Sequence, residues 1–275
     1  MKIKSTLAMI FVALFMASCD KEGNDPKVLD FSGSYEGYTL ASSSYFQNMV
    51  SAGEIISIAE NPDGTASVSF TSATWGEFTI ADAQANMSGS LCTLAGSGQA
   101  RMGMGGNTSS YECSFTAEIK SQSEARMTFE IPAVMGGMKI EFTTGNAPAD
   151  LLLAGTYAGY TDADCLYFQD RYTDGESMTL TANGDGTVKV VFESASWGTF
   201  SVESAAADMD GSYYVFTGSG SVAMGMGEST NSYDFTLNGR TNAAKDDFSI
   251  VFNVPAVMGG LTVTLLPGSA PAANE

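Results

Sequence analysis

The sequence contains no histidine, and this absence excludes much of the chemistry of enzymes and metal sites. The chain therefore has no Ser–His or Cys–His nucleophile pair, lacks the commonest general base and lacks the usual zinc and copper ligand. Basic residues are also few, 12 Lys and Arg against 31 Asp and Glu, and the net charge of −19 repels nucleic acid. We expect no enzyme, no cofactor, no metal and no nucleic-acid partner.

A long hydrophobic run is also missing from the start of the chain. Residues 7–17 carry no charge, but they fall well short of the roughly 20 residues that a membrane-spanning helix needs. Because Lys2 and Lys4 precede this run, residues 1–18 are interpreted as a signal peptide. Its removal takes away two lysines and no acid, which changes the net charge from −19 to −21.

The apolar run ends in Met16, Ala17, Ser18 and Cys19, which resembles the lipobox of bacterial lipoproteins. In that motif small residues precede a cysteine that is acylated and becomes the new N-terminus. The polar residues 19–30 would form a tether, and they resemble the export signal of Bacteroidetes-type lipoproteins. The prediction is a lipid-anchored protein of the outer membrane, exposed at the cell surface, with the alternative of an ordinary signal peptide and a chance cysteine.

The string PAVMGG occurs twice, at residues 132–137 and 255–260, because a whole domain is duplicated. Residues 31–148 align with residues 153–271 throughout: GSYEGYT matches GTYAGYT, NPDGT matches NGDGT, and SATWGEF matches SASWGTF. The junction over residues 144–152 leaves little spare chain. Two domains of ordinary size follow, at 31–148 and 153–271.

Apolar residues alternate with polar ones inside each repeat. Val188, Val190 and Phe192 are typical of a strand with one buried face. Glycines after Asp63 and Asp185 can take a positive φ and close hairpins. About eight such runs in each repeat favour an all-β fold, with two tandem antiparallel up-and-down eight-stranded barrels. Each PAVMGG is interpreted as the turn before the last strand, with Val134, Met135 and their copies Val257 and Met258 plugging the barrel end.

At this point the chain resembles a family, the calycin-like β-barrel lipoproteins of Bacteroides and relatives. The resemblance covers both repeats and rests on four features: the G-x-Y start (Gly33, Tyr35; Gly155, Tyr157), the DGT hairpin, the Trp-Gly step (Trp75, Gly76; Trp197, Gly198) and the PAVMGG hairpin. Lipocalins start with G-x-W, so tyrosine is a departure that weakens any transfer of lipocalin function. The resemblance implies small lipid-anchored barrels and no particular activity.

One loop stands out as a candidate binding site. The segment between the first two strands of each repeat is long and carries the same aromatic triplet, beside polar residues that differ between the copies. The shared residues are Tyr45, Phe46, Gln47, Tyr167, Phe168 and Gln169. Such rings could form a portal that grips a ligand, or they could fold inward as a plug, because an eight-stranded barrel barely holds its own side chains.

The cysteines suggest a disulfide between Cys92 and Cys113, on strands that flank a hairpin. In the second repeat Tyr214 and Phe235 replace both together, as a packed pair would replace a bonded pair. An exported protein can be oxidised. Two buried free thiols are the alternative, because register is not visible in a sequence. Cys165 is then left over and is expected to be buried near the long loop.

Two other motifs are interpreted as structural. The M-G-M pairs (Met102, Met104; Met224, Met226) could bind Cu(I), but without histidine or clustered cysteine they are better explained as packing. The acidic pairs Asp162/Asp164 and Asp208/Asp210 lack the spacing of a calcium loop and are expected to be solvated carboxylates.

The sequence thus predicts a non-enzymatic surface lipoprotein that binds an extracellular ligand through its two barrels. The ligand would be a glycan or small amphiphile at the barrel ends, or a protein. Its other partner would be outer-membrane lipid, reached through the N-terminal acyl anchor. The alternative is a structural envelope lipoprotein whose barrels are filled and bind no small ligand.

Overall fold

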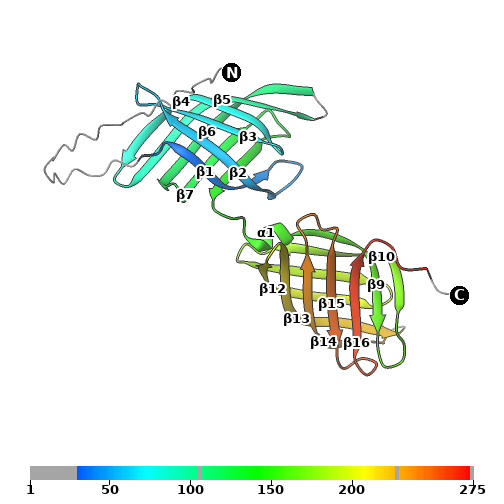
Figure 1. Cartoon of the computed structure of the whole chain (residues 1–275). Coiled ribbons are helices and arrows are strands. Elements are labelled where there is room, and N and C mark those ends of the chain that lie inside the picture. Colours follow the sequence, from blue (N-terminus) through cyan, green and yellow to red (C-terminus); the bar gives the residue numbers. More distant parts are fainter. Residues whose placement is uncertain (1–29, 105–106, 227–228, 273–275) are drawn as a thin grey trace, which may run out of the picture.

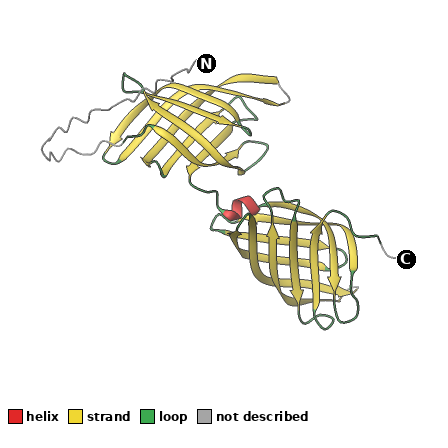
Figure 2. Cartoon of the chain, viewed as in Figure 1, coloured by secondary structure: helices red, strands yellow, loops and turns green. Residues whose placement is uncertain are grey.

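The computed structural model describes residues 30–104, 107–226 and 229–272, so the predicted signal peptide, Cys19 and nearly all of the tether lie outside the described residues. Strands make up nearly all of this part of the chain (Figures 1 and 2). They close into two antiparallel barrels in which each strand pairs with its sequence neighbours, which confirms the predicted fold class. Within these residues no helix is long and apolar enough to cross a membrane.

Barrel 1 closes when the first strand pairs with the eighth. Its strands are β1 (Gly33–Ser42), β2 (Met49–Glu60), β3 (Ala66–Ser72), β4 (Gly76–Ser88), β5 (Leu91–Met104), β6 (Asn107–Ser121), β7 (Glu124–Ile131) and β8 (Met138–Thr144). Barrel 2 repeats this order, and β16 pairs with β9. Its strands are β9 (Gly155–Asp164), β10 (Arg171–Ala182), β11 (Thr187–Ser194), β12 (Gly198–Asp210), β13 (Tyr213–Met226), β14 (Ser229–Thr241), β15 (Phe248–Val254) and β16 (Leu261–Pro267).

The interior of each barrel is filled with aromatic rings. In barrel 1 the ring of Phe129 lies 4.9 Å from those of Phe78 and Phe115 and 5.7 Å from that of Phe70, centroid to centroid. In barrel 2 the Phe252 ring lies 4.7 Å from Phe200, 5.3 Å from Phe192 and 5.7 Å from Phe235. All eight rings are at most 2% exposed. The inward positions predicted from alternation therefore form a packed core in each barrel.

The end of each barrel where the first strand begins is closed by its own chain. The hydroxyl of Tyr35 donates to the carbonyl oxygen of Phe31 at 2.6 Å, and that of Tyr157 donates to Leu153 at 2.8 Å. Burial raises the pKa of Tyr35 to about 12. The tyrosine of the G-x-Y start therefore anchors the chain that enters the barrel. The sequence did not predict the short helix α1 (Ala149–Leu153), which packs on barrel 2.

The predicted disulfide between Cys92 and Cys113 is wrong. Cys92 lies opposite Ile119 and Cys113 lies opposite Gly98, so the two cysteines are offset by six residues, or about 20 Å along the strands. Disulfides need Cα atoms within about 7 Å. The prediction paired residues that lie at unequal distances from the hairpin tip. Both thiols are free and buried, and burial raises the pKa of each, which keeps them protonated and unreactive.

We expect three free thiols when the mature, acylated chain is denatured without reductant and titrated. They belong to Cys92, Cys113 and Cys165, all free in the structure. A titration with a thiol-specific chromophore checks this number. If the titration finds a single free thiol, Cys92 and Cys113 are disulfide-bonded after all, and the β5–β6 register must be shifted by six residues.

Candidate functional site

The loops β1–β2, β3–β4, β5–β6 and β7–β8 meet at one end of barrel 1, which we call the mouth. The equivalent loops of barrel 2 form its mouth. In an up-and-down barrel alternate loops lie at the same end, so the topology brings the predicted Tyr-Phe-Gln triplets to the mouths. Both mouths carry the same Tyr-Phe-Gln triplet, and the residues on either side of it differ.

The loop between β1 and β2 is held by hydrogen bonds within itself. The amide of Ser43 donates to the carbonyl oxygen of Phe46 at 2.8 Å, and the amide of Tyr45 donates to the Ser43 hydroxyl at 3.0 Å. The side-chain amide of Gln47 donates to the Ser43 carbonyl at 2.7 Å. Asn48 has a positive φ of 53°, a conformation that asparagine adopts more readily than most residues. The loop is therefore a compact turn with a defined shape.

The equivalent loop of barrel 2 has the same shape with a cysteine at its centre. The amide of Cys165 donates to the Phe168 carbonyl at 2.9 Å, and the Tyr167 amide lies 3.3 Å from the Cys165 sulfur. Cys165 thus takes the place of Ser43 as the acceptor inside the turn. Its thiol is half-buried, close to the position expected from the sequence.

The two aromatic residues of each triplet point in opposite directions. Phe46 stacks on Trp75 with ring centroids 6.3 Å apart, and Phe168 lies 6.1 Å from Trp197. Both phenylalanines pack against the barrel cores, so they form plugs. The tyrosines point to solvent instead: Tyr45 is 81% exposed and Tyr167 is 76% exposed. The plug and portal interpretations are therefore divided between neighbouring residues. Of the two rings in each triplet only the tyrosine is free to touch a ligand, and Gln47 and Gln169 are exposed beside it.

A buried network of hydrogen bonds holds the tryptophan on which each plugging phenylalanine packs. The indole N–H of Trp75 donates to the Thr39 hydroxyl at 2.7 Å. The hydroxyl of Ser72 accepts from the Trp75 amide at 3.1 Å and donates to the Glu54 carboxylate at 2.7 Å. Ser51 also donates to Glu54, at 2.6 Å. Because the polar groups are paired, the mouth can bury a carboxylate without leaving it unsatisfied.

Barrel 2 repeats this network. Trp197 donates from its indole to Thr161 at 2.9 Å, and Ser194 donates to Glu176 at 2.7 Å. Glu54 and Glu176 are each 7% exposed. Their side chains turn inward at β-bulges, where Gly53 (φ 70°) and Gly175 (φ 73°) each add one unpaired residue. Sequence reasoning missed both glutamates, although the Gly-Glu pair that marks each bulge is retained in both repeats.

The PAVMGG turns place a methionine beside each exposed tyrosine. Val134 and Val257 pack on the cores as predicted. The prediction for the methionines is wrong, because Met135 (φ 47°) and Met258 (φ 52°) have positive φ values and point outward, 46% and 47% exposed. Backbone bonds tie the turns to the tyrosine loops, from Ser44 to Met135 at 3.2 Å and from Leu166 to Met258 at 3.3 Å.

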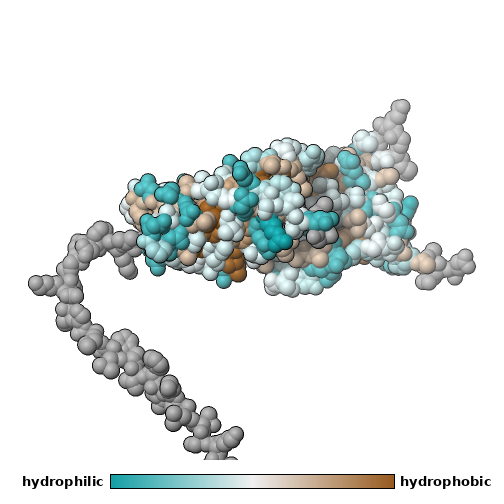
Figure 3. Space-filling view, turned by 90° about the horizontal axis from the view of Figure 1, so that it is seen from above, coloured by the Kyte–Doolittle hydropathy of each residue, from teal (hydrophilic) through white to brown (hydrophobic). Residues whose placement is uncertain are grey.

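We call the exposed set the rim, defined by three residues in each barrel. In barrel 1 these are Tyr45, Met49 and Met135, and in barrel 2 they are Leu166, Tyr167 and Met258. On the face shown in Figure 3, apolar residues appear as separate brown patches among pale and teal ones. The six rim side chains are 46–81% exposed, so they offer apolar contact area outside the cores.

Three acidic residues of barrel 2 lie together at its mouth, whereas Asp208 and Asp210 lie at the β12–β13 hairpin at the other end of the barrel. Carboxylate oxygens of Asp162, Asp164 and Asp170 lie within 4.8 Å of one another. Burial, followed by the charges of Asp164 and Asp170, raises the pKa of Asp162, whose Oδ1 has no hydrogen-bond partner among the described residues. Arg171 is directed to the rings of Phe168 and Trp197, 5.4 Å from each centroid. Carboxylate oxygens suit a hard cation such as Ca²⁺, but this cluster by itself does not define a site.

The M-G-M pairs are explained in part by packing. Met102 and Met224 are half-buried against the two cores, in agreement with the structural interpretation. The side chains of Met104 and Met226 lie outside the described residues.

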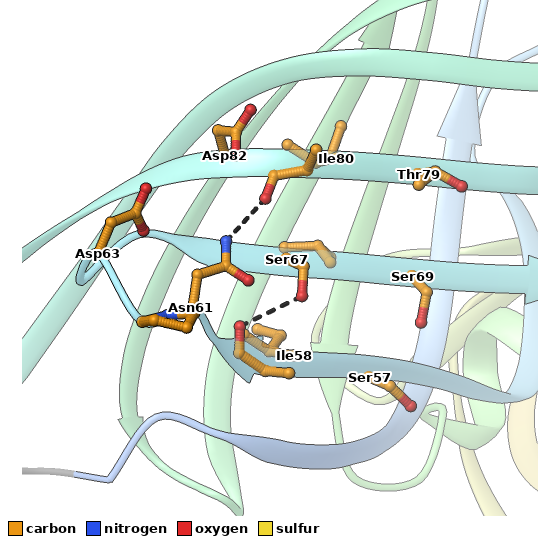
Figure 4. A pocket seen from close by; sticks show the side chains of 13 residues that line it. Ser57, Ile58, Asn61, Asp63, Ser67, Ser69, Thr79, Ile80 and Asp82 are labelled. Carbon is orange, nitrogen blue, oxygen red and sulfur yellow. Dashed lines mark hydrogen bonds between the residues drawn. The ribbon is translucent and has the colours of Figure 1, made fainter.

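A groove of about 660 Å³ on the outer wall of barrel 1 was not predicted from the sequence (Figure 4). Small residues of β2, β3 and β4 line it, among them Ser57, Ser67 and Thr79, near the β2–β3 turn. In barrel 2, Lys189 and Glu203 replace Ser67 and Ala81 and form an ion pair at 2.8 Å. The groove therefore depends on local side chains of barrel 1. The exposed tyrosine and methionine of the rim occur in both barrels, so the rim is the stronger candidate site.

Comparisons with known proteins agree with this architecture. The model of the calycin-like beta-barrel domain family matches the chain twice, over residues 31–145 and 153–265. A solved structure from Bacteroides fragilis NCTC 9343, described as a "putative outer membrane protein", has a TM-score of 0.67 and 22% sequence identity. The alignment covers 86% of this chain and 97% of that one. No curated protein matches the chain.

Proposed function

Because the chain belongs to the calycin-like β-barrel domain family, we propose that it is a non-enzymatic outer-membrane lipoprotein that binds an extracellular glycan through its two rims. The lipid anchor rests on the sequence around Cys19. The proposed location at the outer membrane is in keeping with the description of the B. fragilis structure. That structure is similar to this chain in fold alone.

The observation that carries the proposal is the exposure of one tyrosine on the same compact loop of both barrels. Tyr45 and Tyr167 are more than three-quarters exposed, although their loops are ordered by internal hydrogen bonds. A tyrosine held in this way loses little conformational freedom on binding, and its ring offers a large contact face. A buried tyrosine would offer no contact face, and a disordered one would lose more conformational freedom on binding.

The filled interiors favour a ligand that stays outside the barrels. The aromatic cores occupy the inward positions, and Phe46 and Phe168 close the mouths above them. A small amphiphile would have to displace these rings, whereas a glycan needs only a face on which a sugar ring can lie. The carboxylates beside Tyr167 can accept hydrogen bonds from sugar hydroxyls.

The presence of two rims on one chain suits a polymeric ligand built from repeating units. Two rims on one chain can engage two segments of the same polymer, which raises the overall affinity without any new contact. The net charge of −21 that remains without residues 1–18 disfavours acidic polymers. A neutral polysaccharide meets both conditions.

The proposal is tested with the chain from Asp20 onward, passed over immobilised neutral polysaccharides such as mannan, dextran and galactomannan. We expect at least one of them to retain the protein. Tyr45→Ala and Tyr167→Ala should each weaken binding by roughly tenfold, and the double variant should lose the gain from bivalency as well. The control is Thr71→Ala, an exposed residue on the wall of barrel 1.

Melting temperatures separate binding from folding in this experiment. The tyrosine variants should melt within a few degrees of the parent, because exposed residues contribute little to stability. If no neutral polysaccharide retains the protein, or if the double variant is retained as well as the parent chain, the rims are not glycan sites. The first of these outcomes would favour the alternative, a structural protein with filled barrels.

A further inference from the structure

Barrel 1 has a strand edge that the closure of the barrel leaves unpaired. Strand β6 pairs with β7 only as far as Ser114, opposite Glu130. Strand β7 ends at Ile131, and Pro132 has no N–H with which to continue the ladder. Within the described residues, no strand pairs with the outer side of residues 107–113. The β5–β6 hairpin accordingly projects beyond the rest of the barrel (Figure 1).

This edge lacks three of the features that usually prevent strand pairing. Natural edges are blocked by lysine, proline or a β-bulge. Residues 107–113 read NTSSYEC and contain neither lysine nor proline, and the register of β6 with β5 is regular over their whole length. Thr108, Ser109, Ser110 and Glu112 are exposed. The edge is therefore open to a further strand.

We propose that this edge pairs, antiparallel, with the same edge of a second copy of the chain. In the proposed register Ser110 lies opposite the partner's Ser110, and Thr108 lies opposite the partner's Glu112. The pairing relates two identical surfaces by a two-fold axis, so it produces a closed dimer. Backbone hydrogen bonds supply the contact, as in other complexes formed by strand addition.

The charges on the edge are complementary in this register. Arg101 lies opposite Ser110 on β5, and its Nε donates to the Thr108 hydroxyl at 3.2 Å. The guanidinium also contacts Glu77, with Nη1 and Oε2 3.5 Å apart. The positively charged guanidinium of Arg101 therefore lies beside Thr108, the residue that faces the partner's Glu112 in the proposed register. Opposite charges near one another favour the pair, and no two acids lie directly opposite.

The hairpin of barrel 2 provides a contrast within the same chain. Strand β14 pairs with β15 only as far as Thr236, so this edge is open as well. Asp234 occupies the position of Glu112, but Ala223 replaces Arg101. An acid without a nearby base gains nothing from self-pairing in this register. The structure therefore assigns the dimer contact to barrel 1.

Sedimentation of the chain from Asp20 onward, at physiological salt and over a range of concentrations, tests the proposal. Salt at this level screens repulsion between the two acidic chains. We expect a monomer–dimer equilibrium in which Ser110→Lys weakens association at least tenfold, because it places two lysines opposite each other. Ser232→Lys, at the equivalent position of β14, should leave association unchanged.

Mixing variants distinguishes a pairing defect from a folding defect. Ser110→Lys and Ser110→Glu should each associate more weakly alone than the parent chain and should form a mixed dimer when combined. Ser110→Cys should form a disulfide-linked dimer on mild oxidation, because directly opposed strand residues have Cα atoms about 4.5–5.5 Å apart. Ser232→Cys should not. A chain that stays monomeric at all concentrations, or a dimer that Ser110→Lys does not weaken, overturns the proposal.

Discussion

Replacing Phe129 by alanine is expected to lower the free energy of unfolding of barrel 1 by about 3–5 kcal/mol. Phe129 is fully buried, and its ring lies against those of Phe70, Phe78 and Phe115. Truncation removes the burial of one ring and also leaves a cavity that its three neighbours cannot fill without leaving their own contacts. The loss is a large fraction of the stability of an ordinary domain.

Phe252→Ala makes the same change in barrel 2, where Phe192, Phe200 and Phe235 surround the ring. The two cores share no residue, so calorimetry should show that each variant lowers the melting transition of one barrel and leaves the other near its original temperature. Tyr45→Ala is the control and should change stability by less than about 0.5 kcal/mol. A small effect of Phe129→Ala would mean that the interior tolerates empty space, and the account of filled barrels would be wrong.

Replacing Cys19 by serine is expected to abolish the attachment of the lipid anchor. The motive is the sequence at residues 16–19, after an uncharged run of residues 7–17. Serine cannot form the thioether that carries the lipid, so the variant should stay unprocessed or appear in the soluble fraction. The barrels themselves should be unaffected, because the cores lie within residues 31–142 and 153–265.

Fractionation and mass spectrometry of the mature protein check this prediction. The parent chain should begin at an acylated Cys19 and partition with membranes. Cys165→Ser serves as the control, since it removes a thiol without touching the predicted anchor. Should the mature protein begin at another residue with a free amine, the chain would not be a lipoprotein.

The fold could be predicted because strand alternation and turn glycines occur in both copies of the repeated sequence. Alternation at Val188, Val190 and Phe192, and glycines that do take positive φ values at Gly64 and Gly186, indicated strands and hairpins directly. The family model and the closed barrels bear out the architecture. Local pattern and turn chemistry were sufficient here, because each strand pairs with its neighbour in the chain.

Features that depend on register or backbone direction could not be predicted in this way. The disulfide failed because alternation gives the face of Cys92 and Cys113 but not their offset. Met135 and Met258 point outward because their φ values are positive, a property that residue type does not reveal. The triplets were correctly placed in a loop at the mouth, yet their division into exposed tyrosine and packed phenylalanine required the contacts with Trp75 and Trp197.

The claim that both barrels are filled, and that contact occurs outside them, is tested most directly by titrating the chain with a fluorescent fatty acid such as cis-parinaric acid. The account predicts no saturable binding and no rise in melting temperature, because the aromatic cores and the Phe46 and Phe168 plugs leave no room inside. Saturable binding of one fatty acid per barrel, with a rise in melting temperature that grows with its concentration, would contradict it.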